Sequence, residues 1–296
     1  MKFVPSGHTL GARVEGLDLA EPLGNEQFLA LEQALGKYGV LSFPLQTLTA
    51  LQLKKFSERF GRLEINVANL YQQPGIPEVM ILSNKVLNGK PLGMSDAGQD
   101  WHTDMSYSSM IAFTNVLYGV EIPHRDGQAL GNTEFCDMHA AYVDLSDDLK
   151  TRLAGMTVTH DFAKFWDKMR REKGSTRPPL TDAQRAAKPP VSHPIFLSHP
   201  ITGKEVLYAN PGYSMRINEL PEVVSDHMLA FLSAHQLQAK YQYRHRWAVG
   251  DVLMWDNMGT LHNAVPDYRP DEHRYILRCQ VMANRYFGEA GEQKAA

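Results

Sequence analysis

The sequence of 296 residues lacks the features that mark several protein classes. Its two cysteines, Cys136 and Cys279, need form no disulfide for a chain of this size to fold, so we expect reduced thiols and a cytoplasmic protein. No apolar run approaches the roughly 18 residues of a membrane-spanning helix, and the N-terminus lacks the apolar segment of a signal peptide. Lys and Arg total 30 against 33 Asp and Glu, and the net charge of −3 favours neither nucleic acid nor a membrane. A small molecule is the expected partner.

What the sequence does contain is a mixture of helical and extended patterns. Apolar residues at helical spacing follow Asn25 as far as Gly39 and follow Thr49 as far as Gly61, where Leu53, Phe56 and Phe60 form the apolar side. A later helix carries Val224, Met228, Phe231 and Leu232 on one side. Short β-rich runs bounded by turn residues lie at 40–43, 79–82, 114–120 and 252–255. Many short strands of this kind predict a barrel or a jelly roll within an α+β fold.

The segment 161–190 differs in character from its surroundings. It begins with aromatic and charged residues and ends in a stretch rich in proline, alanine and charge. A long insertion of this composition is typical of a mobile lid over an active site. Because no repeat and no convincing linker interrupts the chain, we expect a single domain over 1–296.

Three side chains form the strongest candidate site. His102 and Asp104 are two residues apart, so in an extended stretch both project to one face. His262 lies 262 − 102 = 160 residues further on, beside the predicted strand at 252–255. Two imidazoles and one carboxylate leave half of an octahedral ion open and are expected for a non-haem Fe(II) oxygenase. A structural zinc site would instead require four protein ligands, usually including cysteine.

Two arginines follow His262 on a predicted strand. Arg274 and Arg278 share one strand face because their separation is even. Guanidinium groups that point into a β-core need anions to pair with, which suggests bound carboxylates. The alternative is a pair of surface arginines on an edge strand.

These segments together resemble the taurine dioxygenase and 2,4-dichlorophenoxyacetate dioxygenase family of Fe(II)- and 2-oxoglutarate-dependent oxygenases. The resemblance covers about Gly11 to Tyr286 and is closer to the phenoxyacetate branch. It is carried by the motifs at 101–104, 132–138, 243–247 and 254–257, and by the segment from His262 to Arg278. It implies a double-stranded β-helix, or jelly roll, with flanking helices.

The resemblance also implies roles for individual residues. His102, Asp104 and His262 match the iron ligands, and Arg274 with Thr133 matches the pair that holds the distal carboxylate of the cosubstrate 2-oxoglutarate. Arg278 matches the position that binds the anionic group of the prime substrate. The lengthened loop at 124–131 departs from the family pattern and is expected to alter how Thr133 is presented. Pocket or lid residues predicted from chain position alone are Asn66, Asn69, Tyr71, Met105, Tyr107, Phe162 and Tyr213, of which Tyr107 and Asn69 are our substrate-binding candidates.

The expected activity is hydroxylation of a small carboxylate or sulfonate, such as an aryloxyalkanoate, with O2 consumed and succinate and CO2 released. A relative that desaturates or hydroxylates a secondary metabolite would use the same ligands. Outside the family, a zinc hydrolase or a non-catalytic β-barrel binding protein are the alternatives. The oligomeric state stays open, with a homo-oligomer as one outcome.

Overall fold

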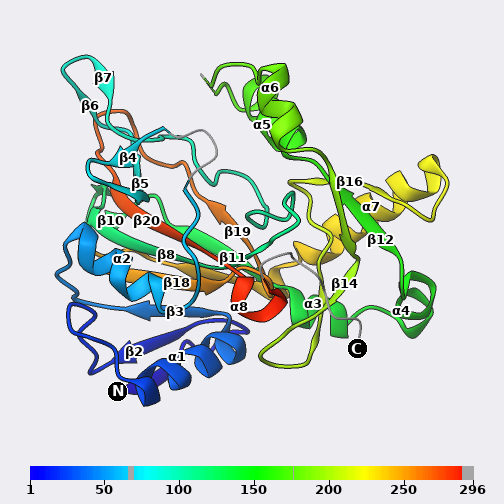
Figure 1. The fold of residues 1–296 in the computed structure, drawn as a ribbon, viewed down its shortest axis with the longest axis horizontal. Helices are drawn as coiled ribbons and strands as arrows, with labels where there is room; N and C mark the ends of the chain where they lie inside the picture. Colours follow the sequence, from blue (N-terminus) through cyan, green and yellow to red (C-terminus); the bar gives the residue numbers. More distant parts are fainter. Residues whose placement is uncertain (66–69, 176, 289–296) are drawn as a thin grey trace.

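The computed structural model describes residues 1–65, 70–175 and 177–288. Its largest element is an eight-stranded, mostly antiparallel sheet with the strand order β1-β2-β3-β18-β8-β20-β5-β4 (Figure 1). In that order the strands are Lys2–Pro5, Ala12–Glu15, Val40–Phe43, Val252–Asp256, Ala112–Glu121, Tyr275–Met282, Ile76–Ser83 and Gln72–Gln73. The predicted strands at 40–43, 79–82, 114–120 and 252–255 are confirmed.

A smaller sheet carries part of the candidate site. It has the order β17-β11-β19, with strands Gln242–His245, Thr133–Asp137 and Thr260–Ala264. The chain crosses from the large sheet to the small one at the turn between β18 and β19, so His262 lies directly after that corner. The two sheets and their flanking helices form the α+β fold with a jelly-roll core that the sequence predicts.

The large sheet is buried on both faces, as alternation along β18 shows. Leu253 and Trp255 belong to an apolar cluster that includes Phe135 of the small sheet. Val252 and Met254 instead belong to the cluster that contains the apolar sides of helices α1 (Asn25–Tyr38) and α2 (Ala50–Glu58). Successive strand residues point to opposite faces, so one strand contributes to both layers.

Both N-terminal helices form where the sequence predicts them. Helix α1 ends at Tyr38, and the capping residue Gly39 has a φ of 67°, a conformation that glycine adopts without strain. The Thr49 side chain accepts a hydrogen bond from the Gln52 N–H and caps α2. Helix α2 ends at Glu58, so Phe60 packs in the core from beyond the helix.

The rest of the chain forms small sheets, hairpins and helices beside these two sheets. The three-stranded sheet β13-β12-β16 consists of Val191–Pro194, Thr157–His160 and Ser214–Ile217. Two-stranded pairs are β14 with β15 (Phe196–Ser198, Glu205–Leu207), β6 with β7 (Val86–Leu87, Lys90–Pro91) and β9 with β10 (His124–Arg125, Gln128–Ala129). The remaining helices are α3 (Met138–Val143), α4 (Asp147–Leu153), α5 (Phe162–Glu172), α6 (Asp182–Ala187), α7 (Glu222–Gln236), η1 (Ala239–Tyr241) and α8 (Asn284–Phe287). None of the helices in the described ranges has the length and apolarity needed to cross a bilayer.

The segment 161–190, which the sequence predicts to be a lid, contains the helices α5 and α6. One expectation needs correction. The predicted late helix is α7, but Phe231 is 48% exposed, whereas Met228 and Leu232 are buried. Residues 228, 231 and 232 are all compatible with one broad helical face, and only the position of the neighbouring elements decides that Phe231 lies outside it.

Candidate active site

A backbone bridge brings the candidate metal ligands together. His102 and His262 form an isolated antiparallel pair, in which the His102 N–H donates to the His262 carbonyl (3.1 Å) and the His262 N–H to the His102 carbonyl (2.9 Å). Residues directly opposed in an antiparallel pair project to the same side. The two imidazoles consequently lie with their ring centres 4.2 Å apart.

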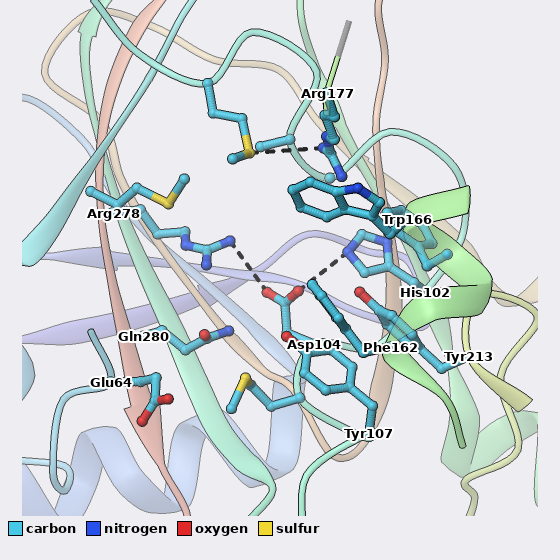
Figure 2. A pocket seen from close by; sticks show the side chains of 16 residues that line it. Glu64, His102, Asp104, Tyr107, Phe162, Trp166, Arg177, Tyr213, Arg278 and Gln280 are labelled. Carbon is cyan, nitrogen blue, oxygen red and sulfur yellow. Dashed lines mark hydrogen bonds and ion pairs between the residues drawn. The ribbon is translucent and has the colours of Figure 1, made fainter. Parts of the chain in front are cut away.

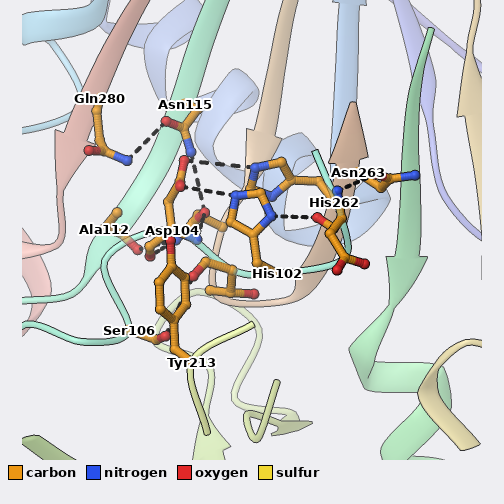
Figure 3. A network of polar contacts seen from close by, with 12 residues as sticks. His102, Asp104, Ser106, Ala112, Asn115, Tyr213, His262, Asn263 and Gln280 are labelled. Atoms are coloured by element: carbon orange, nitrogen blue, oxygen red, sulfur yellow. Dashed lines mark hydrogen bonds and ion pairs between the residues drawn. The ribbon is translucent and has the colours of Figure 1, made fainter. Parts of the chain in front are cut away.

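Asp104 completes the cluster. Its Oδ1 lies 3.3 Å from His102 Nε2, and its Oδ2 lies 3.8 Å from His262 Nε2. The three candidate ligand atoms all lie within 4.8 Å of one another, and all three residues are buried. Two segments more than 150 residues apart in sequence therefore present two nitrogens and a carboxylate around one point (Figure 3).

Hydrogen bonds fix the orientation of two of these groups. His102 Nδ1 donates to the Asp100 carbonyl at 2.8 Å, so the lone pair of a neutral ring is on Nε2, toward Asp104. The Asn257 side chain holds the backbone of Asp104 from both sides, since Oδ1 accepts from the Asp104 N–H (3.2 Å) and Nδ2 donates to its carbonyl (2.8 Å). The carboxylate is thus anchored to the turn that precedes β19.

The charges around the cluster favour its metal-binding form. Burial alone would raise the pKa of the Asp104 carboxyl, but the Arg278 guanidinium, 3.5 Å away, and the two histidines hold this pKa well below its usual range. Burial, with His102 nearby, lowers the pKa of His262 well below its usual value. At neutral pH the site therefore offers an ionised carboxylate and a neutral His262 imidazole, the states in which these groups bind metal ions.

Arg274 is built into a different part of the site. It is buried, and its Nε has no hydrogen-bond partner within the described residues. A Cβ on Gly131 would lie 2.9 Å from both Cδ and Nε of Arg274, so the guanidinium packs where only glycine leaves room. A buried cation with an unused donor suits an anionic ligand.

Thr133 lies two residues after Gly131, at the start of β11. Its side chain is buried, and its Oγ1 accepts a hydrogen bond from Trp247 Nε1 at 3.0 Å. That contact leaves the hydroxyl hydrogen free to donate to a ligand. The loop at 124–131 forms the β9–β10 hairpin, which Arg125 ties to Glu272 at 2.5 Å.

A pocket opens beside the metal cluster (Figure 2). Arg278 lines this pocket, whereas Arg274 is not part of its lining. Arg274 precedes β20, and the pairing of β20 with β8 shifts register between Tyr275 and Ile276. The regular strand on which the two arginines were predicted to share a face therefore does not extend to Arg274. Aromatic side chains form much of the wall, namely Tyr107, Phe162, Phe165, Trp166 and Tyr213.

The segment 161–190 contributes to this wall and is tied to the chain that leads into His102. Arg177 pairs with Asp96 at 3.0 Å, and Lys168 pairs with Asp100 at 2.5 Å. The Arg177 guanidinium also lies over the Trp166 ring, 5.0 Å from its centre. Helix α5 and the residues after it are thereby held over the pocket.

Chain position alone predicted some of the pocket residues correctly and others wrongly. Met105, Tyr107, Phe162 and Tyr213 line it, Tyr71 does not, and Asn66 and Asn69 lie outside the described residues. Sequence reasoning missed Glu64, Phe165, Trp166, Arg177 and Gln280. Gln280 had a usable signal, because it follows Arg278 by two residues on the same strand face.

A second cluster with the same residue types was also missed. His139, His199 and Asp256 have candidate ligand atoms within 4.8 Å of one another. His199 Nε2 lies 3.0 Å from Asp256 Oδ2, and both residues are fully buried. Nothing in the local sequence links these three positions, because each comes from a different element.

Comparisons with known proteins agree with this geometry. The sequence profile of the Taurine catabolism dioxygenase TauD, TfdA family matches residues 2–280. The chain is 34% identical, over 85% of its length and 87% of the relative, to the alpha-ketoglutarate-dependent 2,4-dichlorophenoxyacetate dioxygenase of Cupriavidus pinatubonensis. It is 31% identical to pentalenolactone F synthase of Streptomyces avermitilis, over 92% and 90% of the two chains. A crystal structure of AAD-2 in complex with Mn(II) and N-oxalylglycine matches with a TM-score of 0.79 and 27% identity, covering 95% of this chain and 98% of that one.

Proposed function

Because this chain belongs to the taurine catabolism dioxygenase TauD, TfdA family and is an α-ketoglutarate-dependent dioxygenase, we propose that it oxidises a small carboxylate or sulfonate whose anionic group binds Arg278. Family membership sets aside the two alternatives from outside the family, a zinc hydrolase and a non-catalytic binding protein. The alternative inside the family, a tailoring enzyme for a secondary metabolite, keeps the support of its similarity to pentalenolactone F synthase.

His102, Asp104 and His262 hold Fe(II) in this proposal. The support is their convergence on one point, the lone pair that His102 directs there, and the low pKa of the Asp104 carboxyl. Two nitrogens and one carboxylate form the ligand set of non-haem iron oxygenases. The Mn(II) complex of AAD-2 is consistent with a divalent ion in this fold.

Arg274 and Thr133 hold the distal carboxylate of the cosubstrate 2-oxoglutarate. The unpartnered, buried Nε of Arg274 supports this role, and the Thr133 hydroxyl has a hydrogen left to donate. When bound, the metal and 2-oxoglutarate supply the oxidising power, with O2 consumed and succinate and CO2 released. This chain's own residues bind, orient and enclose the reactants.

The prime substrate lies between Arg278 and the aromatic wall. Arg278 reaches Asp104 Oδ2 at 3.5 Å, so an anion held by it places the attached carbon close to the metal cluster. The wall of Tyr107, Phe162, Phe165, Trp166 and Tyr213 suits a flat apolar body. An aryloxyalkanoate combines both features, and the 2,4-dichlorophenoxyacetate relative acts on such a compound. We keep Asn69 as a further candidate contact from the sequence.

The segment 161–190 acts as a lid over this pocket, and 1–296 forms one domain. Phe162, Phe165 and Trp166 of α5 line the pocket from one side, so binding of the substrate buries them further. The Arg177–Asp96 and Lys168–Asp100 pairs hold the lid in position. Water is kept from the reacting carbon when these contacts are made.

The single observation that carries the proposal is the placement of Arg278 between the metal cluster and an aromatic pocket. The test measures substrate-dependent succinate formation for aryloxyacetates, aryloxypropionates, taurine and amino-acid derivatives, each with its methyl ester or amide where one exists. Arg278→Gln should raise the KM for the acid more than tenfold, because deletion of one partner of a buried charge pair costs about 2–5 kcal/mol. The 2-oxoglutarate KM should stay nearly unchanged.

Arg216→Gln is the matched control, because Arg216 is exposed on β16, away from the pocket. Assays use saturating Fe(II), since Arg278 also influences Asp104. Turnover of a neutral ester as fast as its acid would show that Arg278 serves only as an internal partner of Asp104.

A further inference from the structure

Strand β20 places two different polar side chains along the proposed substrate pocket. Arg278 and Gln280 both line the pocket, and their even spacing puts them on one strand face. Two residues of a strand span about 7 Å, so a donor-only guanidinium and an amide lie about that far apart. A ligand that lies along β20 meets both groups.

The orientation of the Gln280 amide follows from a chain of hydrogen bonds that begins at a peptide group (Figure 3). The oxygen and nitrogen of a side-chain amide can exchange places by a flip that leaves its shape unchanged. The backbone N–H and carbonyl of Asp104 cannot exchange places, so they fix the direction of the chain. Asn257 Oδ1 must therefore face the Asp104 N–H, and the same oxygen accepts from Asn115 Nδ2 at 3.3 Å. Asn115 Oδ1 is then left to accept from Gln280 Nε2 at 3.2 Å. The Gln280 Oε1 has no partner within the described residues, so the amide offers the pocket an acceptor.

Glu64 adds a second acceptor beside the first. Its N–H donates to the Gln280 carbonyl at 2.9 Å, and the preceding Leu63 bridges Val281, so the backbone of Glu64 runs alongside the end of β20. The Glu64 side chain lines the pocket and forms no ion pair or side-chain hydrogen bond within the described parts of the chain. An ionised carboxylate only accepts hydrogen bonds. The end of the pocket beyond Arg278 thus carries acceptors from Glu64 and Gln280 (Figure 2).

We propose that the pocket selects a bipolar substrate, in which a hydroxyl or ammonium group binds Glu64 and Gln280 while the carboxylate binds Arg278. This inference rests on the proposed function and adds the chemistry of the opposite end of the substrate. A substrate with an apolar tip would take water from the Glu64 carboxylate and the Gln280 carbonyl without replacing its hydrogen bonds. Sites that hydrogen-bond a substrate group reject analogues that lack it.

The test uses three phenoxyacetates that differ only at the position opposite the ether: 4-hydroxy, 4-aminomethyl and 4-methyl. Binding is measured without O2 by quenching of tryptophan fluorescence, since Trp166 lines the pocket, and turnover by succinate formation. Wild-type protein should bind the hydroxyl or the ammonium compound at least tenfold more tightly than the methyl compound. The stronger of the two identifies the donor.

Two variants assign the preference to its residues. Glu64→Gln removes the charge at constant size and should lower the affinity for the ammonium compound more than tenfold, with a smaller loss for the hydroxyl compound. Gln280→Met removes the amide acceptor at similar length and should weaken both polar compounds while leaving the methyl compound unchanged. Glu58→Gln, on the exposed side of α2, is the matched control and should change neither affinity.

Phenoxyacetate and phenoxyethanol separate this inference from the proposed function. If phenoxyacetate binds better than phenoxyethanol but the three 4-substituted acids bind equally, the anion site stands and the bipolar inference is wrong. If Glu64→Gln and Gln280→Met leave a wild-type preference intact, the inference is also wrong. If phenoxyethanol binds as well as phenoxyacetate, the proposed anion site fails, and the bipolar inference fails with it.

Discussion

Within the described parts of the chain, two clusters each combine two histidines with one aspartate, yet His102 of the first and His199 of the second use their ring nitrogens differently. In the first, His102 Nδ1 donates to the Asp100 carbonyl, so Nε2 keeps a lone pair for a ligand. In the second, His199 Nδ1 faces the N–H groups of Ile201 and Thr202 at 3.3 Å and must accept from them. The proton of a neutral His199 is then on Nε2, which lies 3.0 Å from Asp256 Oδ2.

The two clusters also differ in how accessible they are to a ligand. His102 and Asp104 line the pocket, whereas His199 and Asp256 are fully enclosed, and a Cβ on Gly259 would lie 2.3 Å from Asp256 Oδ2. The first cluster lines a pocket and is open toward a ligand, whereas the second, which we call the closed cluster, is enclosed within the protein. Residue type alone does not make a metal site, because the backbone that faces the far nitrogen decides which nitrogen can bind.

The largest expected effect separates the two clusters directly. His102→Ala or His262→Ala should abolish metal-dependent turnover, a loss greater than the roughly 10–100-fold typical of a ligand's supporting partners. His139→Ala, the matched change in the closed cluster, should leave bound metal and turnover close to wild type. Metal content after dialysis and succinate formation are the measurements, with near-UV circular dichroism as the check on folding. One equivalent of metal lost in His139→Ala would show that both clusters bind ions.

Changes in the closed cluster should instead lower the stability of the folded protein. Asp256→Asn cannot accept from both the Met258 N–H and His199, so we expect a loss of about 3 kcal/mol in the free energy of unfolding. Burial opposes ionisation of Asp256, but His199 and His139 hold the pKa of its carboxyl below the ordinary value of 3.8. The stabilisation is therefore complete above that pH and is lost as the pH falls below it.

Urea unfolding of both proteins at pH 7 and at pH 3 measures this difference. The difference in the free energy of unfolding between wild type and Asp256→Asn should be smaller at pH 3 than at pH 7. A difference that is the same at both pH values would show that the ionised carboxylate is not its source.

Two arginines differ in a similar way, because one has a donor without a partner and the other is already paired within the protein. Arg274 has an unpartnered Nε, so Arg274→Ala should raise the 2-oxoglutarate KM more than tenfold, which corresponds to about 2 kcal/mol or more for a lost charge pair. Arg125 already pairs with both carboxylate oxygens of Glu272, at 2.8 and 2.5 Å. Arg125→Ala should leave this KM within about twofold, since exposed pairs contribute about 0–1 kcal/mol. Steady-state kinetics at fixed prime substrate tests both, and equal KM values for wild type and Arg274→Ala would remove Arg274 from the site.

The smallest effect is expected for two buried threonines. Thr133→Val should raise the 2-oxoglutarate KM by a few-fold, because a neutral hydrogen bond contributes about 0.5–1.5 kcal/mol. Thr114 donates its hydroxyl hydrogen to the Trp255 carbonyl at 2.7 Å, so it has no hydrogen left to donate to a ligand. Thr114→Val should lower stability with no change in KM. A KM change of equal size in both variants would show that the effect comes from destabilisation of the core and not from a contact between Thr133 and 2-oxoglutarate.

The sequence predicts those parts of the molecule that depend on neighbouring residues. The Thr49 cap and the limits of α1 at Asn25 and Gly39 are local patterns, and motif resemblance adds His262 and Thr133. Glu64 could not be predicted, because its place in the pocket depends on the pairing of Leu63 with Val281 across more than 200 residues. The closed cluster could not be predicted either, because its three residues come from separate parts of the chain.

The position of β20 has a consequence for how the protein is made. β20 is inserted between β8 and β5, yet it is the last strand in the described chain, so both neighbouring strands are synthesised long before their common partner. Sheets assembled from such distant segments fold slowly, because a large loop must close before any pairing is formed. All three proposed metal ligands have been translated by residue 262, while β8 and β5 still expose unpaired edges toward the missing strand. A chain that stalls on the ribosome before Tyr275 therefore has all three proposed metal ligands but leaves the facing edges of β8 and β5 without their common partner.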